Sequence, residues 1–122
     1  MTLMSETNRL LEECQLSQDR FFEMRRLDKD PDFFLEVKPY ADAVHAEIKV
    51  WQQHAHDWIQ KNQPKNLYAQ QIDHAADAME QFVVQSFYKG TSKKRFIQSI
   101  QSTHYTLSIV KTKLEEGEQH VQ

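Results

Sequence analysis

Residues 44–58 read VHAEIKVWQQHAHDW, and the apolar side chains in this stretch recur at alternating spacings of four and three residues. They are Val44, Ile48, Trp51, Ala55 and Trp58. Because an α-helix turns once every 3.6 residues, this spacing places them on one face of a helix. The stretch therefore predicts an amphipathic helix that buries a single apolar stripe.

The same pattern occurs in three other segments, which together with the first span most of the chain. Their stripe residues are Leu3, Leu10, Cys14, Phe21 and Met24 in a helix over about 3–27; Ile72, Ala75, Ala76, Met79, Phe82 and Val83 in the next; and Phe96, Ile100, Leu107, Val110 and Leu114 in the last. Alternating spacings of three and four are typical of helices packed about 20° from parallel. Short connections force neighbouring helices to be antiparallel, so residues 1–122 predict one all-α domain, a four-helix up-and-down antiparallel bundle.

Turn and capping residues separate the predicted helices. Residues 30–32 (DPD) supply an N-cap and a proline for the start of the second helix, and Pro39 is expected to kink it. Residues 62–66 (NQPKN) predict a turn. Gly90 is expected to adopt a left-handed conformation after the third helix, and Gly117 to mark the end of the fourth.

Composition narrows the classes of function. The net charge is −3 and the charges are mixed along the chain, whereas nucleic acids and anionic membranes require a basic surface. The single cysteine, Cys14, cannot form an intramolecular disulfide, and neither a signal peptide nor a transmembrane run is recognisable. We therefore expect a cytoplasmic protein with a protein partner, either a monomer or a weak homodimer.

The sequence contains six histidines, but none has the spacing of a metal site. No glutamate is followed three residues later by histidine, as di-iron bundles require, so we predict no metal and no cofactor. His45 and His104 fall beside the apolar stripes, where each is expected to hydrogen-bond a neighbouring side chain. The alternative hypothesis is a metal-binding or enzymatic bundle that uses His45, His54 or His104.

No catalytic motif is present, so the sequence favours a protein that is not an enzyme. Cys14 lies on the apolar stripe and is expected to be a buried small hydrophobe. Carboxylates are expected to avoid the inward positions, which excludes a buried acid–base pair. Ser17, Ser86 and Thr103 do fall inward, and each is expected to bond to a preceding backbone carbonyl.

A basic turn opens the predicted fourth helix. Its cations are Lys89, Lys93, Lys94 and Arg95. Positive charges at a helix start oppose the helix dipole by roughly 0.3–1 kcal/mol each, and free N–H groups there favour an anion. One hypothesis is therefore a contact with an anionic ligand, nucleic acid or partner; the other is neutralisation by Asp28, Asp30 and Asp32, which the up-and-down order brings to the same end.

Tyr105 and Ile109 form a second candidate surface. They lie one turn apart and face away from the stripe of the fourth helix. Single exposed apolar residues are common on soluble proteins, so this pair is either ordinary surface or a small apolar contact for a partner.

Several segments resemble the YppE-like family of small proteins from Bacillus and related Gram-positive bacteria. The similar segments are 33–40 (FFLEVKPY), 70–73 (QQID), 84–88 (VQSFY), 94–96 (KRF) and 104–107 (HYTL). The resemblance covers about residues 3–114 and implies a four-helix bundle without implying an activity. Ala69 departs from the proline expected at the start of the third helix. Together these observations predict a non-catalytic helical bundle that acts through macromolecular interaction.

The stripe of the second helix predicts a large energetic role for Trp51. Replacing Trp51 with alanine should lower the free energy of unfolding by roughly 3–5 kcal/mol, the usual cost of deleting a large buried aromatic side chain. Urea denaturation measures the loss. A value below about 1 kcal/mol would mean that the ring is exposed and that the register of this helix is wrong.

Overall fold

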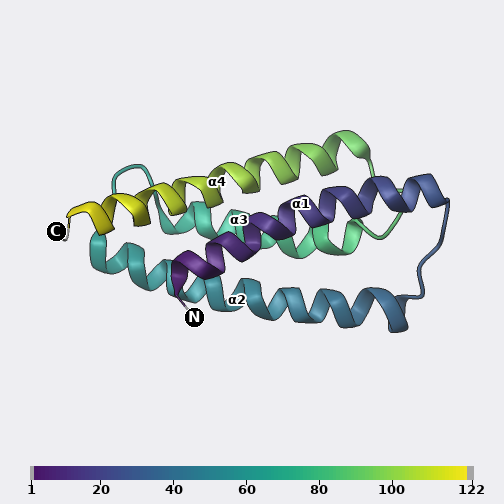
Figure 1. The fold of residues 1–122 in the computed structure, drawn as a ribbon, viewed down its shortest axis with the longest axis horizontal. Coiled ribbons are helices and arrows are strands. Elements are labelled where there is room, and N and C mark those ends of the chain that lie inside the picture. The colour runs from purple at the N-terminus through teal and green to yellow at the C-terminus, as the bar shows by residue number, and fades with distance from the viewer. Residues whose placement is uncertain (1, 121–122) are drawn as a thin grey trace.

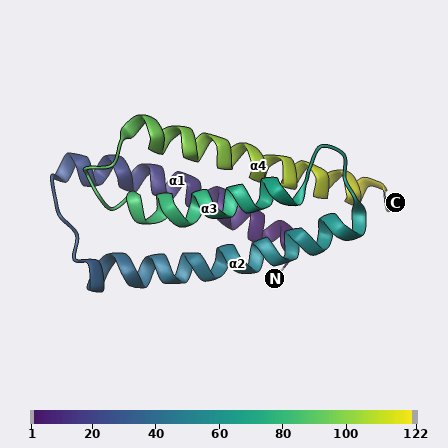
Figure 2. The same ribbon diagram turned by 180° about the vertical axis from the view of Figure 1, so that it is seen from behind.

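The structure, a computed structural model, describes the backbone of residues 2–120 and the side chains of residues 2–117. Its elements are α1 (Leu3–Leu27), a π-helical turn η1 (Phe33–Val37), α2 (Lys38–Asn62), α3 (Ala69–Gln85) and α4 (Lys93–His120). Successive α-helices run in opposite directions, as Figure 1 and the reverse view in Figure 2 show. The predicted four-helix up-and-down antiparallel bundle is confirmed.

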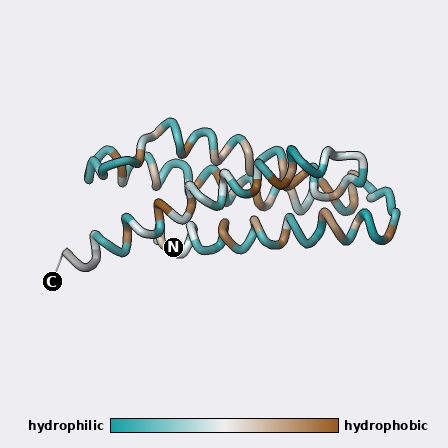
Figure 3. The backbone as a smooth tube through the Cα atoms, turned by 90° about the horizontal axis from the view of Figure 1, so that it is seen from above, coloured by the Kyte–Doolittle hydropathy of each residue, from teal (hydrophilic) through white to brown (hydrophobic). Residues whose placement is uncertain are grey.

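The core consists of the predicted stripes, and the apolar positions recur along each helix in Figure 3. The side chains of Cys14, Ile48, Met79 and Leu107 are all buried, one from each helix. Members of the stripes near the helix ends, such as Leu114, are only half-buried. The spacing therefore predicted most of the core, but it missed Val37, Ala41 and Leu67, which are also buried.

Two aromatic contacts join three helices near one end of the core. The rings of Phe21 and Phe96 stack with their centroids 4.1 Å apart, and Phe82 packs edge-on against Phe96 at 6.2 Å. Farther along, the fully buried Trp51 donates its indole N–H to Thr7 Oγ1 at 3.0 Å. This bond satisfies the polar atom of the indole, so the ring serves as core without an unpaired donor.

The connection between α1 and α2 differs from the prediction. Asp32, and not Asp30, is the N-cap: its Oδ1 accepts from the Leu35 N–H at 3.0 Å, while its own N–H donates to Glu36 Oε2 at 2.6 Å. Pro39 lies in the first turn of α2, where an N–H has no partner within the helix, so it does not kink α2. The irregular backbone precedes it, in the widened turn η1, where the Lys38 N–H donates to the Phe33 carbonyl.

The two glycine predictions were wrong, whereas the turn at 62–66 is confirmed. Gly90 does not have a positive φ, because α3 ends at Gln85 and the connection that follows contains ordinary turns. Helix α4 continues past Gly117 to His120. In the turn after α2, Gln63 and Asn66 take the left-handed conformation, with φ of 44° and 64°.

The four seams between adjacent helices are not equivalent. Helices α1 and α4, α3 and α4, and α2 and α3 approach closely along their lengths, whereas α1 and α2 have fewer backbone approaches. The connections α1–α2 and α3–α4 lie at the same end of the bundle (Figure 1), which we call the η1 end. None of the helices in the described part of the chain combines the length and apolar character needed to cross a bilayer.

Candidate functional site

A buried carboxylate lies in the seam between α1 and α2, contrary to the prediction that carboxylates avoid inward positions. Glu13 is 0% exposed, and Glu6, two turns earlier on α1, is 6% exposed. Ionised carboxylates are rarely buried unless they are paired and hydrogen-bonded. The seam must therefore supply partners for both.

Each oxygen of the Glu13 carboxylate has two partners. Tyr40 donates its hydroxyl to Glu13 Oε1 at 2.6 Å, and Ser17 donates to Oε2 at 3.0 Å. Two guanidinium groups complete the shell: Arg9 Nη2 lies 3.1 Å from Oε1 and Arg20 Nη1 lies 3.6 Å from Oε2. Ser17 thus bonds a side chain, and not the backbone carbonyl that the sequence predicted.

Arg20 extends this network to α3 and the residues after it. Its guanidinium lies 4.3 Å from the ring centroid of Tyr40 and 4.6 Å from that of Phe87, and it donates to Ser86 Oγ at 2.9 Å. Ser86 in turn donates to the Val83 carbonyl at 2.6 Å, as predicted. A cation between two aromatic faces gains about 0.5–2 kcal/mol per contact, more where water is excluded. Arg20 therefore joins α1, α2 and the end of α3.

The network is suited to holding helices together and poorly suited to chemistry. Both oxygens of Glu13 are occupied by protein donors, and the carboxylate is sealed from solvent. Burial raises the pKa of the Tyr40 hydroxyl, and its hydrogen bond to Glu13 raises it further. Tyr40 therefore remains a protonated donor well above neutral pH.

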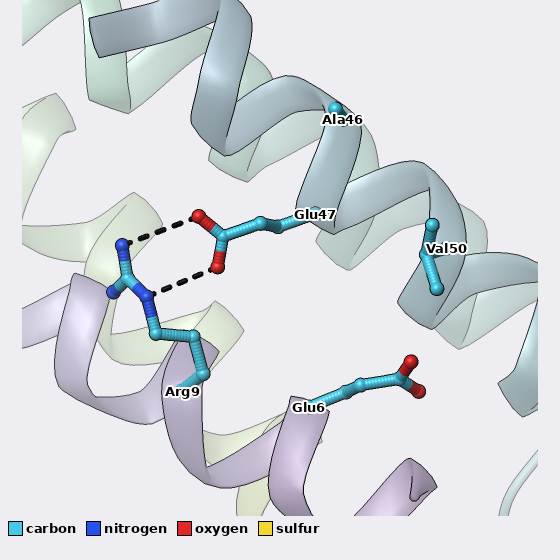
Figure 4. Close-up of a pocket in the computed structure, with 5 residues that line it drawn as sticks. All are labelled: Glu6, Arg9, Ala46, Glu47 and Val50. Atoms are coloured by element: carbon cyan, nitrogen blue, oxygen red, sulfur yellow. Dashed lines mark hydrogen bonds and ion pairs between the residues drawn. The ribbon is translucent and has the colours of Figure 1, made fainter. Parts of the chain in front are cut away.

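A shallow hollow lies beside this network, between α1 and α2 (Figure 4). Arg9 crosses it to Glu47, with Nε 3.0 Å from Oε2, and Glu6 and Val50 line the other side. Its volume of about 220 Å³ is below the roughly 300–1,000 Å³ of small-molecule sites.

The three histidines of the metal hypothesis have separate partners. His45 Nε2 lies 2.9 Å from the Glu80 carbonyl, a backbone atom where a side chain was expected, and His54 Nδ1 lies 2.7 Å from Glu6 Oε1. His104 is exposed and faces only Ser108, at 3.5 Å. Among the described side chains, no three histidines, cysteines or carboxylates are grouped in a way that could hold a metal ion.

Other inward polar residues follow the prediction only in part. Thr103 is buried, but among the described residues its hydroxyl has no hydrogen-bond partner, although a preceding carbonyl was expected. Cys14 is buried, as predicted, and burial raises the pKa of its thiol to about 12 with a further contribution from the Glu13 charge. The thiol is thus protonated and unreactive at neutral pH.

The basic turn is only partly neutralised. Lys89 Nζ lies 2.8 Å from Asp28 Oδ1 and 3.9 Å from Asp30 Oδ1. Lys93, Lys94 and Arg95 are exposed in the first turn of α4, and none forms an ion pair with a carboxylate of residues 2–117. Lys93 Nζ instead lies 5.5 Å from the ring centroid of Phe22 on α1.

The apolar pair on α4 is less exposed than expected. Tyr105 is 68% exposed, but Ile109 is half-buried against the core. Both line an open depression together with Asn66 and Gln71. The pair therefore gives one exposed ring and no continuous apolar patch.

The largest exposed apolar group was not predicted. Phe33, Phe34 and Leu35 on η1 are 45%, 73% and 79% exposed. The signal was present in the sequence, because three consecutive apolar residues on a helical turn point in different directions and cannot all face one core. In the sequence analysis these three residues contribute only to the family resemblance of segment 33–40.

Comparisons with known proteins point to one group. The model of a bacterial domain of unknown function, DUF1798, matches residues 7–114. The uncharacterized protein YppE of Bacillus subtilis is 29% identical over 113 residues, which are 93% of this chain and 92% of YppE. The predicted resemblance to YppE-like proteins is thus confirmed.

Solved structures agree with the fold. A crystal structure of YppE from Bacillus subtilis matches with a TM-score of 0.91 and 27% identity, covering 96% of this chain and 95% of that one. A Listeria innocua protein of unknown function also gives a TM-score of 0.91 at 27% identity, covering 98% of this chain and 95% of that one.

The network predicts a large cost for removing Glu13. A Glu13→Ala variant should lose about 3–5 kcal/mol in free energy of unfolding, because it leaves buried cations and a tyrosine hydroxyl without their acceptor. Glu12→Ala, an exposed neighbour on the same helix, is the control and should change stability by less than about 0.5 kcal/mol. Equal, small losses in urea denaturation would mean that Glu13 is not a buried partner of the arginines.

The raised pKa of Cys14 predicts a loss of stability at high pH. The thiol ionises near its ordinary pKa of 9.0 in the unfolded chain and near 12 in the folded one, so the folded state binds more protons between these values. Stability should therefore fall as pH rises through this window, by up to about 1.4 kcal/mol per pH unit from this group. Cys14→Ala should give a shallower decline between about pH 9 and pH 11 in urea denaturation. Parallel profiles would contradict the assignment.

Proposed function

We propose that this chain, which belongs to the DUF1798 family of bacterial domains of unknown function, is a non-catalytic cytoplasmic protein that acts by binding another protein at the η1 end. The observation that carries the proposal is the exposure of Phe33, Phe34 and Leu35. The largest apolar patch on a soluble monomer is often functional, and these three side chains form the largest exposed apolar group among the described residues.

The patch is held in one conformation, which favours recognition. The capping bonds between Asp32, Leu35 and Glu36 fix the turn, and the fully buried Val37 anchors it to the core. The rings of Phe33 and Phe34 pack edge to face, 5.2 Å apart. A preorganised apolar surface loses little conformational entropy when a partner binds.

Two observations support the non-catalytic and cytoplasmic parts of the proposal. Both oxygens of the buried Glu13 carboxylate are occupied by Tyr40, Ser17 and the two arginines, which leaves Glu13 no free lone pair for acid–base chemistry. Cys14 is a free thiol in the core, which suits a reducing compartment.

The alternatives receive less support. A metal-binding bundle built on His45, His54 or His104 would need further ligands near one of them, and among the described side chains each bonds to a separate element. Nucleic-acid binding through residues 89–95 would draw on Lys89, which already pairs with Asp28. Three free cations on a chain of net charge −3 make a small electrostatic footprint for a polyanion.

A photo-crosslinking amino acid tests the proposed surface. Placed at position 34 and irradiated in the native host, it should give a discrete protein adduct, because Phe34 lies at the centre of the proposed contact. The same amino acid at Tyr105, which is similarly exposed on α4, is the control and should give none of that adduct. Absence of any protein adduct at position 34, or the same adducts at both positions, would contradict the proposal.

A further inference from the structure

Two surfaces of opposite character lie at the η1 end. The acidic–apolar patch consists of Phe33, Phe34 and Leu35 with the flanking carboxylates of Asp32 and Glu36. The basic patch consists of Lys93, Lys94 and Arg95 at the start of α4 with the adjoining ring of Phe22, which is 40% exposed.

Neither patch has its charge neutralised within the chain. Among the described side chains, Asp32 and Glu36 accept bonds only from backbone N–H groups of their own turn and form no ion pair. The acids that do reach the neighbouring loop, Asp28 and Asp30, are directed at Lys89. The excess negative charge of one patch therefore matches the excess positive charge of the other.

The fold prevents the two patches from meeting in one molecule. In Figure 1 the start of α2 lies at the lower right and the start of α4 at the upper right, with the end of α1 between them. Figure 2 shows the same separation from behind. Arg25, near the end of α1, donates a hydrogen bond to the Thr91 carbonyl in the α3–α4 connection. This bond holds the end of α1 against the connection that leads to the basic patch.

We propose that the partner of the η1 end is a second copy of this chain, in an end-to-end dimer with two-fold symmetry. A half-turn about an axis perpendicular to the plane of Figure 1 places the lower side of one copy against the upper side of the other. The acidic–apolar patch of each copy then faces the basic patch of its partner. The acidic–apolar patch therefore meets the basic patch at two places in the dimer, related by the two-fold axis, as an isologous interface requires.

The size of the surface sets the strength of the dimer. The exposed parts of Phe33, Phe34 and Leu35 amount to on the order of 300 Å² on each copy, well below the roughly 800 Å² per partner of a standard interface. The basic patch and Phe22 add polar and aromatic area. The dimer is therefore weak and sensitive to salt.

Sedimentation velocity of the purified chain tests this directly. The average mass should rise from monomer to dimer between about 1 and 500 µM, and raising NaCl from about 50 to 500 mM should weaken association. Lys93→Glu with Lys94→Glu should raise the dissociation constant at least about tenfold, since it places two glutamates against Asp32 and Glu36. Glu36→Gln, which removes one negative charge but keeps an acceptor for the Asp32 N–H, should raise it by a smaller factor.

Controls separate this interface from general charge effects. Lys61→Glu with Lys65→Glu makes the same change in net charge at exposed positions of α2 and the α2–α3 connection and should leave the dissociation constant unchanged. Phe34→Ser with Leu35→Ser, which leaves the charges intact, should also abolish the dimer. Circular dichroism verifies that each variant remains folded.

The inference builds on the proposed function, and the two can fail separately. A purified chain that stays monomeric to about 500 µM, or a dimer unaffected by Lys93→Glu with Lys94→Glu, would each overturn the dimer. If the crosslinker at position 34 then captures a different protein, the proposed function stands without the dimer. If it captures nothing, both are wrong.

Discussion

The buried carboxylate of Glu13 imposes the strongest local constraint on this bundle. An ionised group in a dry interior must be surrounded by donors, and here they come from two helices: Arg9, Ser17 and Arg20 on α1 and Tyr40 on α2. Arg20 also donates to Ser86, so the network extends to the end of α3. Tyr40 lies in the first turns of α2, directly after η1. Holding Tyr40 against Glu13 therefore also places the turn that carries Phe33, Phe34 and Leu35.

The apolar part of the fold follows from helical periodicity, and the polar part does not. The α3 stripe from Ile72 to Val83 was identified in full, because apolar side chains at that spacing have only one way to leave water. Glu13 has the spacing of the α1 stripe, three residues after Leu10 and four before Ser17, but the residue type suggested a surface position. Identifying it would have required pairing Glu13 with Tyr40, 27 residues away, which depends on the tertiary packing of α1 and α2.

The errors at the connections have a similar cause. Proline and glycine restrict or free the local backbone without deciding where a helix ends. Pro39 was expected to kink α2, yet the chain widens into a π-helical turn that ends two residues earlier, and this places Pro39 in the first turn of α2. Asp28, Gln63 and Asn66 take the left-handed conformations, while Gly90 does not. Two of these positive φ values belong to the C-caps of α1 and α2, so their positions depend on where those helices end.

The polar seam between α1 and α2 and the exposed apolar turn η1 are physically related. Apolar contacts are non-directional, so a seam of leucines would hold α1 and α2 together while tolerating rotation of α2 about its axis. The hydrogen bond from the Tyr40 hydroxyl to Glu13 has a defined direction, and it remains satisfied only near one rotation of α2. Replacing a buried ionic cluster with hydrophobic side chains often leaves stability unchanged or increases it, so strength alone does not explain why the cluster is here. Its distinct effect is to fix the rotation of α2, and with it the direction in which Phe34 and Leu35 face solvent. The seam and the surface at the η1 end are thus two consequences of one constraint: the buried charge sets the geometry that the exposed side chains present.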